Sequence, residues 1–434
     1  MLRSPIDTPL RSPIARMDIY QADFTNGSLP GGSTFTRNDA AYVHNSAGLI
    51  VPLAAHEPKF DYNPTTFEPM GILLEPARNF YMRRSEEFDN GTWWTPTNGT
   101  ITANQTDAPV SPAGNTAADL FKEDGTANLH HMSQTLAALS ANQTFTVTVW
   151  AKPFGAKDRL FIHLIDTTAT GNNAGIIFNL STGAVVTNVQ AGTGTAATAD
   201  ATSIAYPGGW RRYRAVIKPT TASNTGVNIR IGGTNNGGTT VSYTGSTSDG
   251  IYLWGGNMEN NITCYSYIKT LDAAVTTIQD QLTGLFPSNF NSAASTMFLR
   301  ASMPRFGNTG FPGMWSLDDG GFNNRHTIFF TDASGGRIGG NTTQGGVSQS
   351  SLVPAITMTP NEAVKVALAV AANDSNCAAN GTLATLDTAV TLPSGINTSA
   401  IGKVSTGGAC GGHIRELRYY PTRLGDAELQ ALTA

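Results

Sequence analysis

The sequence predicts an all-β protein with two β-sandwich domains, preceded by an extended N-terminal anchor and a small β element. Three observations support this fold class. First, apolar residues alternate with polar ones in many short runs, as Phe145, Val147 and Val149 do with threonines. Second, clusters of glycine, asparagine and threonine, such as 232–238, separate these runs as turns separate strands. Third, no amphipathic stretch of about 10–15 residues lies between them, which excludes a parallel α/β fold.

The composition is that of a charge-poor chain that can form hydrophobic cores. Of its 434 residues, 40% are hydrophobic, which argues against disorder. Charged residues make up only 13%, about half of the ~25% that is usual. The 27 basic and 31 acidic residues give a net charge of −4, which argues against a nucleic-acid partner. No run of about 18 apolar residues occurs, so we expect no membrane insertion. The N-terminus also lacks the apolar core of a secretory signal.

Residues 1–32 are predicted to be an extended anchor. The motif Arg-Ser-Pro-Ile occurs at 3–6 and again at 11–14, and each proline fixes φ and removes a backbone donor. A segment of this kind does not fold alone, so it would add to a partner; the alternative is a frayed terminus. Four regularly spaced apolar residues favour the anchor, because they would otherwise be exposed to water: Leu2, Ile6, Leu10 and Ile14.

The rest of the chain divides into four predicted regions. Residues 33–77 form a small β element. Residues 78–268 form the first β-sandwich, because several short alternating runs occur there with turn signals between them. Residues 269–289 form a linker. Residues 290–434 repeat the pattern of short alternating runs and form the second β-sandwich.

Two local motifs have clear signals. Asn-Ser-Ala-Gly at 45–48 is typical of a hairpin turn. Residues 424–432 predict a short amphipathic helix, with Gly425 as N-cap and Glu428 at the third helical position. The second sandwich is therefore expected to end on one helix.

A tract in the small β element carries a signature. Thr34 to Arg37 reads Thr-Phe-Thr-Arg, and 60–64 reads Phe-Asp-Tyr-Asn-Pro. Residues 71–79 then read Gly-Ile-Leu-Leu-Glu-Pro-Ala-Arg-Asn. This combination resembles the pre-domain signature of bacteriophage virion appendage proteins, the fibre, spike and decoration components. Lys59 stands here where arginine is usual in that signature.

The two predicted sandwiches carry further motifs. Ser-Glu-Glu-Phe at 85–88, Gly-Trp-Arg-Arg-Tyr at 209–213 and Gly-Ile-Tyr-Leu-Trp-Gly at 250–255 are similar to motifs of carbohydrate-binding-module-like jelly rolls in phage fibres. Gly-His-Ile-Arg-Glu-Leu at 412–417 resembles the last strand of concanavalin-A/laminin-G-like sandwiches. The resemblance implies a jelly roll for the first sandwich and a concanavalin-like fold for the second.

The same resemblance implies a non-enzymatic structural protein of the virion, assembled in the host cytoplasm. Its N-terminus would bind other virion proteins of the capsid, portal, collar or tail, and its sandwiches would project and bind host-surface glycans. Appendages of this kind are usually homo-oligomers, trimers most often, and a charge-poor surface suits side-by-side packing of β-modules. Two alternatives remain open: a capsid decoration or collar protein without receptor binding, and a polysaccharide-degrading enzyme with accessory modules.

Exposed aromatic rings are the sequence feature that best indicates a sugar-binding site, because they stack on pyranose rings. Trp93 and Trp94 are adjacent, so in a strand one can be buried while the other is exposed. Trp315 is a third candidate. Trp210 and Trp254, by contrast, are expected in the core or at its rim. The predicted glycan-binding residues are therefore Trp93, Trp94 and Trp315.

A structural calcium ion is a further expectation drawn from the resemblance. Related jelly rolls often hold Ca²⁺ with oxygen ligands from the first and last strands, and Glu87 and Glu259 match those places. Because Ca²⁺ takes about six to eight oxygen ligands, two carboxylates do not establish a site. The alternative is two solvated or cross-strand-paired carboxylates.

No motif indicates catalysis. Glu86 and Glu87 are adjacent, so in a strand they face opposite sides and do not form an acid/base pair. His130 and His131 are neighbours and lack the spacing of a zinc site on a helix. We therefore predict no enzymatic activity and no catalytic residues.

The three cysteines, Cys264, Cys377 and Cys410, do not form a disulfide framework or a CxxC metal site. Cys377 and Cys410 either pair across strands or remain two buried thiols. The sequence leaves both alternatives open.

Overall fold

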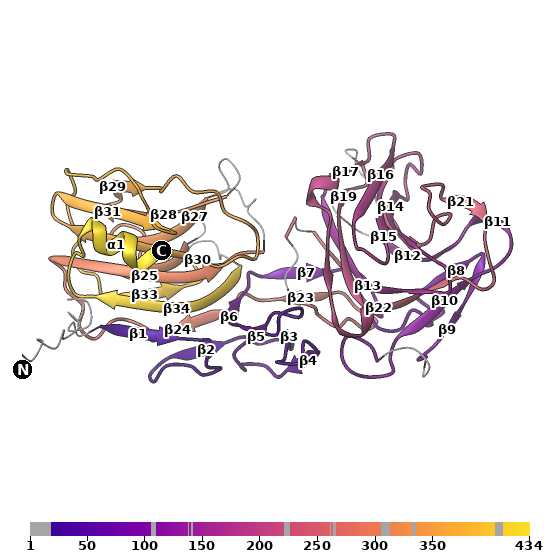
Figure 1. The fold of residues 1–434 in the computed structure, drawn as a ribbon, viewed down its shortest axis with the longest axis horizontal. Coiled ribbons are helices and arrows are strands. Elements are labelled where there is room, and N and C mark those ends of the chain that lie inside the picture. Colours follow the sequence, from indigo (N-terminus) through magenta and orange to yellow (C-terminus); the bar gives the residue numbers. More distant parts are fainter. Residues whose placement is uncertain are drawn as a thin grey trace, which may run out of the picture. The chain divides into compact units, whose positions relative to one another are not determined.

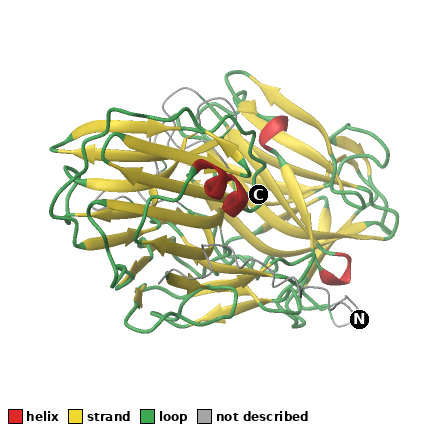
Figure 2. Cartoon of the chain, turned by 60° about the vertical axis from the view of Figure 1, so that its left-hand side comes forward, coloured by secondary structure: helices red, strands yellow, loops and turns green. Residues whose placement is uncertain are grey.

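The structure of the chain is a computed structural model that describes residues 19–105, 110–137, 139, 142–220, 226–260, 262–263, 266–304, 313–331, 336–403 and 411–434. Figure 2 shows that strands dominate the chain and that helices are few and short, which confirms the all-β prediction. The chain forms two compact units: residues 35–281, and the residues up to Thr34 together with 282–434. Across the described residues, no helix is long and apolar enough to cross a membrane. The predicted anchor residues Leu2, Ile6, Leu10 and Ile14 lie outside the described residues.

The 35–281 unit contains a sandwich of two antiparallel sheets (Figure 1). The first sheet has the order β17 (Thr195–Ala196), β19 (Arg211–Lys218), β13 (Phe145–Phe154), β22 (Gly250–Glu259), β10 (Asp119–Glu123) and β9 (Gly99–Thr102). β18 (Thr202–Ala205) also pairs with β19, and β7 (Arg78–Phe80) pairs with β22 and β23 (Val275–Thr277). The second, six-stranded sheet has the order β16 (Val185–Ala191), β15 (Asn173–Asn179), β14 (Arg159–Asp166), β20 (Gly226–Gly232), β12 (His131–Ala137) and β8 (Thr95–Thr97). A separate two-stranded antiparallel sheet pairs β11 (Ala127–Leu129) with β21 (Ser242–Thr244).

The period-two pattern fills the space between these two sheets. Phe145, Val147 and Val149 of β13 lie in one buried cluster with the alternating residues of β14, and none of them is more than 1% exposed. Because successive side chains of a strand point to opposite faces, one face of each sheet supplies this core. The predicted sandwich is confirmed by this packing.

The small β element covers the opposite face of the first sheet. Its strands are β3 (Ala41–His44), paired with β4 (Ile50–Leu53), and β5 (Phe60–Tyr62), paired with β6 (Pro69–Leu74). Ile50 packs in a second buried cluster with Trp150, Trp210 and Trp254. The rings of Trp150 and Trp254 lie 5.3 Å apart at 71°, a favourable edge-to-face arrangement. The first sheet is therefore buried on both faces.

The predicted hairpin turn joins β3 to β4. The side chain of Asn45 accepts hydrogen bonds from the backbone N–H groups of Ala47 and Leu49, at 2.9 and 3.0 Å. Gly48 has φ +72°, and a Cβ there would lie 2.6 Å from the ring of Phe67. Glycine is therefore required at this position for both backbone conformation and space.

The other unit is also a sandwich of antiparallel strands. One sheet contains β32 (Thr382–Leu383), β31 (Asp374–Ala379), β30 (Val364–Ala371), β25 (Ala294–Ser302), β34 (Gly412–Tyr420) and β1 (Tyr20–Asp23). The second contains β24 (Gln281–Thr283), β33 (Thr398–Ile401), β26 (Gly313–Asp318), β27 (Arg325–Thr331), β28 (Arg337–Gln344) and β29 (Val347–Leu352). The helix α1 (Asp426–Thr433) follows β34, as predicted, and the carboxylate of Glu428 accepts a hydrogen bond from the N–H of Gly425 at 2.8 Å.

The N-terminal segment differs from its prediction where the structure describes it. Residues 20–23, assigned to an extended anchor, form strand β1 and pair antiparallel with β34, with Tyr20 opposite Tyr419. Ala22 and Phe24 are each 1% exposed. The physical reason is that β34 offers unpaired backbone groups along one side, and a neighbouring strand satisfies them. The anchor prediction is therefore wrong for this part of the segment.

Candidate functional site

Two of the three predicted glycan-binding tryptophans are buried. Trp94 is 1% exposed and donates a hydrogen bond from Nε1 to the carbonyl oxygen of Arg83 at 3.1 Å. Trp315 is fully buried, and its Nε1 donates to Oγ of Ser399 at 3.1 Å. Each ring lies inside its sandwich with its polar atom satisfied, so neither can stack on a sugar. For both residues the prediction is wrong, whereas Trp210 and Trp254 lie in the core as expected.

Trp93, the third candidate, is half-buried. Its Nε1 donates to Oδ1 of Asp272 at 2.9 Å, and the guanidinium of Arg83 lies 5.7 Å from the ring centroid. The ring also packs against the sandwich core. Trp93 is therefore fixed by contacts within the chain and retains only part of its surface for a ligand.

The predicted calcium ligands have cationic partners in the chain. Glu259 is 1% exposed and lies 3.3 Å from Nη1 of Arg78. Glu87, which is more exposed, lies 2.8 Å from Nη1 of Arg84. Each carboxylate is thus neutralised by a different arginine. Among the described residues, no group of three or more His, Cys, Asp or Glu side chains could hold a metal ion. Glu259 is thus paired with an arginine of the neighbouring strand β7, and Glu87 with one three residues before it, while the calcium ion stays a prediction.

Cys377 is a free thiol in β31 and is buried. Burial raises its pKa to about 12, despite a backbone hydrogen bond that favours the thiolate. Cys264 and Cys410 lie outside the described residues.

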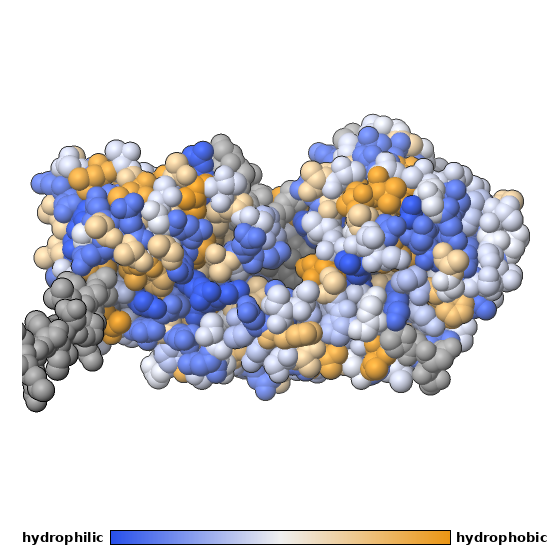
Figure 3. Space-filling view, in the orientation of Figure 1, coloured by the Kyte–Doolittle hydropathy of each residue, from blue (hydrophilic) through white to orange (hydrophobic). Residues whose placement is uncertain are grey.

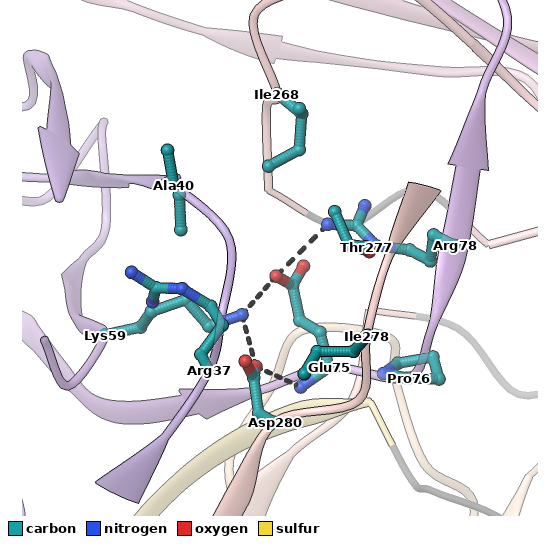
Figure 4. Close-up of a pocket in the computed structure, with 11 residues that line it drawn as sticks. Arg37, Ala40, Lys59, Glu75, Pro76, Arg78, Ile268, Thr277, Ile278 and Asp280 are labelled. Atoms are coloured by element: carbon teal, nitrogen blue, oxygen red, sulfur yellow. Dashed lines mark hydrogen bonds and ion pairs between the residues drawn. The ribbon is translucent and has the colours of Figure 1, made fainter. Parts of the chain in front are cut away.

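The charged residues of the signature tract converge in the 35–281 unit, around a cavity of about 210 Å³ that includes space open to solvent (Figure 4). Lys59 forms ion pairs with both Glu75 and Asp280. Arg78 Nη2 lies 3.2 Å from Glu75, and its Nη1 contacts Glu259. We call these five residues, Lys59, Glu75, Arg78, Glu259 and Asp280, the ion cluster.

Every member of the ion cluster is less than a tenth exposed, so its charges depend on one another. The carboxylate of Glu75 also accepts hydrogen bonds from the N–H and Oγ of Ser266, both at 2.6 Å. Burial alone would raise the pKa of Glu75, but Arg78, Lys59 and Ser266 together lower it to about 2. For Asp280 burial dominates and raises the pKa, although Lys59 opposes the shift. Glu75 is thus the firmly ionised carboxylate of the cluster.

Arg37 and Asp61, also in the signature tract, make further contacts nearby. Arg37 is 2% exposed and donates to the carbonyl oxygens of Asp39, Glu57 and Ala54. Asp61 lies 2.9 Å from Nδ1 of His44, whose Nε2 is 2.8 Å from the hydroxyl of Tyr206 in the sandwich. The His44–Tyr206 contact, like the ion cluster, attaches the small β element to the sandwich, whereas the Arg37 contacts lie within the element. The sequence identified the motif but not this structural role, because the partners are far apart in the chain.

The outer face of the six-stranded sheet is the second region rich in polar side chains. In β14, Leu160, Ile162 and Leu164 point into the core, so Phe161 and His163 point outward. The registers place His163 opposite Arg230 of β20, and Arg230 opposite Ser133 of β12. His131 of β12 points the same way, because Met132 is in the core. We call Phe161, His163, Arg230 and His131 the outer-face cluster.

The outer-face cluster is recessed. Phe161, His163 and His131 are 2, 7 and 6% exposed, although they point away from the core. The rings of Phe161 and His163 lie 4.7 Å apart, and both approach within 3.0 Å of the position that a Cβ on Gly175 would occupy. Gly175 on β15 therefore provides the space into which both rings lean. A sequence signal for this cluster exists, because Leu160, Ile162 and Leu164 alternate with Phe161 and His163 and so assign these two to the outward face.

Apolar residues are dispersed over the visible surface rather than gathered in one large patch. Figure 3 shows mainly polar colours with separate orange areas. The large hydrophobic side chains that are exposed come from many parts of the described chain: Phe67, Val110, Val186, Ile204, Leu271, Ile278, Phe322, Val347 and Leu386. Single exposed apolar residues are normal for soluble folds and indicate no binding site. The outer-face cluster is therefore the stronger candidate site.

Comparisons with known proteins give only weak structural similarity. No family model matches the chain, and no curated protein matches it. The CBM40 of the Ruminococcus gnavus IT-sialidase, solved with α2,3-sialyllactose, is 18% identical over 33% of this chain and 84% of its own, with a TM-score of 0.28. Domain 4 of AbnA, a GH43 extracellular arabinanase from Geobacillus stearothermophilus solved with arabinotriose, is 15% identical over 39% and 81%, with a TM-score of 0.29. The Streptococcus pneumoniae NanB sialidase is 14% identical over 33% of this chain and 25% of its own, with a TM-score of 0.29. Scores this low establish neither a common ligand nor a common activity.

Proposed function

We propose that this chain is a non-enzymatic structural protein of a bacteriophage particle, and that the outer-face cluster binds a saccharide of the host surface. The single observation that carries the binding proposal is the composition of this face. An aromatic ring, imidazoles and an arginine lie together on a sheet whose other face is packed in the core. Saccharide sites combine such rings with a few polar groups that fix the hydroxyls.

Polar groups beside the cluster are suited to sugar hydroxyls. The amide of Asn173 lies 3.0 Å from Nε2 of His163. The amide nitrogen of Asn228 donates to the hydroxyl of Thr135 at 3.0 Å. These amides and hydroxyls can both donate and accept hydrogen bonds, as a saccharide requires.

The phage assignment is supported by the signature tract. Arg37, Lys59, Glu75 and Arg78, all within the quoted motifs or next to them, are buried together in the 35–281 unit. The motif therefore acts as one structural unit, as a pre-domain signature should. The buried carboxylates Glu75 and Glu259 are ion-paired with Arg78, which supports a structural rather than an acid/base role.

Glycan-array binding of the purified chain tests the saccharide proposal. We expect Phe161→Leu, which removes the ring but keeps most of the volume, to weaken binding. Phe154→Leu is a matched control, because Phe154 is a half-buried aromatic of β13 in the other sheet. Absence of binding to any glycan, or equal loss in both variants, would contradict the proposal.

Antibody labelling of phage particles, imaged by electron microscopy, tests the virion location. We propose that the chain is incorporated as a homo-oligomer, a trimer in the first instance, through residues 1–18, and deletion of these residues leaves β1 intact. The deleted chain should fold but be absent from particles. If particles that lack the protein adsorb to cells normally, the chain is a decoration or collar protein without a receptor role. Turnover of a cell-surface polysaccharide by the purified chain would instead favour the hydrolase alternative.

A further inference from the structure

The outward positions of the four central strands of the six-stranded sheet carry no carboxylate. On β12, β14, β15 and β20 these positions hold two arginines and two histidines but no Asp or Glu. Of the arginines, Arg159 is neutralised by Asp158, 2.7 Å away. Arg230 forms no ion pair with any described residue. This imbalance stands out in a chain whose net charge is −4.

The guanidinium of Arg230 is oriented by one hydrogen bond and otherwise free. Its Nε donates to Oδ1 of Asn228 at 3.0 Å, and Asn228 is itself held by Thr135. Neither terminal nitrogen of Arg230 has a hydrogen-bond partner among the described residues. A guanidinium held through Nε presents its two terminal nitrogens as a fork, which matches the two oxygens of a carboxylate.

The neighbouring histidines add buried ring nitrogens without partners. His131 is 6% exposed and His163 is 7% exposed. Nδ1 of each ring has no hydrogen-bond partner. Burying a polar atom without a hydrogen-bond partner destabilises a fold, so such atoms in a native site indicate a missing partner. Both rings lie on the face of Arg230 and interact electrostatically with it.

We infer that the saccharide bound by the outer-face cluster is an acidic one, and that its carboxylate is held by the terminal nitrogens of Arg230. This inference rests on the proposed function and adds the class of ligand. The carboxylate supplies the negative charge that the face lacks, and Nδ1 of a neutral histidine donates to, or accepts from, a sugar hydroxyl according to its tautomer. Phe161 lies two residues from His163 on the same strand, and its ring, 2% exposed, packs beside the His163 ring and fixes its position.

Titration of the whole chain with galacturonate and with galactose tests this inference. The two probes differ in their carboxylate, and a monosaccharide avoids dependence on linkage. Binding is followed through the NMR signals of the His131 and His163 rings. We expect galacturonate to move both signals, and galactose to bind at least tenfold more weakly.

Three variants identify the residue that binds the carboxylate. Arg230→Gln should weaken galacturonate binding at least tenfold. Arg230→Lys should also weaken this binding, because lysine keeps the positive charge but lacks the two terminal nitrogens of the guanidinium. Arg159 lies on the same face of the sheet but is already paired with Asp158. The galacturonate affinity of Arg159→Gln should therefore stay within about twofold of that of the parent chain. Retained dispersion of the backbone amide spectrum shows that each variant is folded.

The outcomes separate the two proposals. Equal binding of galactose and galacturonate, both reduced by Phe161→Leu, would overturn the carboxylate inference and leave the saccharide site standing. Preference for galacturonate that is unchanged by Arg230→Gln would also overturn it. If neither sugar perturbs the histidine signals and the chain binds no glycan of the array, both the saccharide site and its carboxylate specificity are excluded.

Discussion

The ion cluster and the outer-face cluster use the same residue types but resolve their charges in opposite ways. In the ion cluster, Lys59 and Arg78 each contact two carboxylates, and all partners are buried. In the outer-face cluster, Arg230 has an amide as its only partner among the described residues. The partners of a buried or half-buried cation therefore indicate its role. A cation paired with carboxylates stabilises the fold, and a cation without a carboxylate partner is available to a ligand.

The largest effect is expected from breaking the ion cluster. Glu75→Gln removes the carboxylate shared by Lys59 and Arg78, breaks both buried ion pairs and leaves each cation with a single carboxylate, Asp280 or Glu259. We expect the free energy of unfolding to fall by about 3–5 kcal/mol, measured by chemical denaturation. Glu68→Gln, an exposed carboxylate of the same element, is the control and should change stability by less than ~0.5 kcal/mol. If Glu75→Gln lowers the free energy of unfolding no more than Glu68→Gln does, the ion cluster does not stabilise the fold.

Acidification should weaken the fold through the outer face. Burial, and then the positive charge of Arg230, lower the pKa of His131 to about 4, and burial lowers that of His163 to about 4. The unfolded chain, with a histidine pKa near 6.5, therefore binds more protons than the folded one between pH 6.5 and 4, and stability is lost as the pH falls through this window. Each histidine contributes at most ~3 kcal/mol to that loss.

A His131→Gln, His163→Gln double variant isolates this contribution. Its stability should depend less steeply on pH between 6.5 and 4 than that of the parent, when both are measured by denaturation at each pH. If the stability of the parent and of the double variant depends equally on pH, the assignment of neutral His131 and His163 in the folded chain is wrong. Asp119 acts in the opposite direction, because burial raises its pKa to about 6 and favours its neutral form below that pH.

The fold class was predictable from the sequence because strand alternation and turn composition are local properties. The inward residues Phe145 to Val149, the 45–48 turn and the terminal helix all follow from a few neighbouring residues. Pairing of β1 with β34 was missed, since it joins residues about 400 positions apart. Trp94 and Trp315 were misassigned because the exposure of a ring depends on which layer covers it.

The candidate site was less predictable for the same reason. The sequence shows Arg230 between apolar neighbours, but not that its terminal nitrogens lack partners. Nor does it show that Lys59 and Asp280, more than 200 residues apart, form a pair. Distinguishing a paired cation from an unpaired one requires the register of neighbouring strands, which hydrophobic periodicity alone does not give.

A smaller effect is expected from Phe161→Leu. The ring is 2% exposed, and leucine keeps most of its volume, so stability should fall by less than about 1.5 kcal/mol. Saccharide binding should weaken by roughly fivefold, because the Phe161 ring packs beside His163 and fixes its position, and an aromatic pair of this kind contributes about 1 kcal/mol. Isothermal titration with the tightest glycan of the array measures this. Unchanged affinity would exclude the ring from the site.

The free energy of unfolding and the galacturonate affinity, both measured for Lys59→Met and Arg230→Gln, distinguish a structural cation from a ligand-binding one. We expect a crossed result: Lys59→Met lowers the free energy of unfolding by about 3–5 kcal/mol and leaves the galacturonate affinity of the folded chain unchanged. Arg230→Gln weakens that affinity at least tenfold and changes stability by less than about 1 kcal/mol. The account is contradicted if Arg230→Gln destabilises the fold as much as Lys59→Met and leaves galacturonate binding intact.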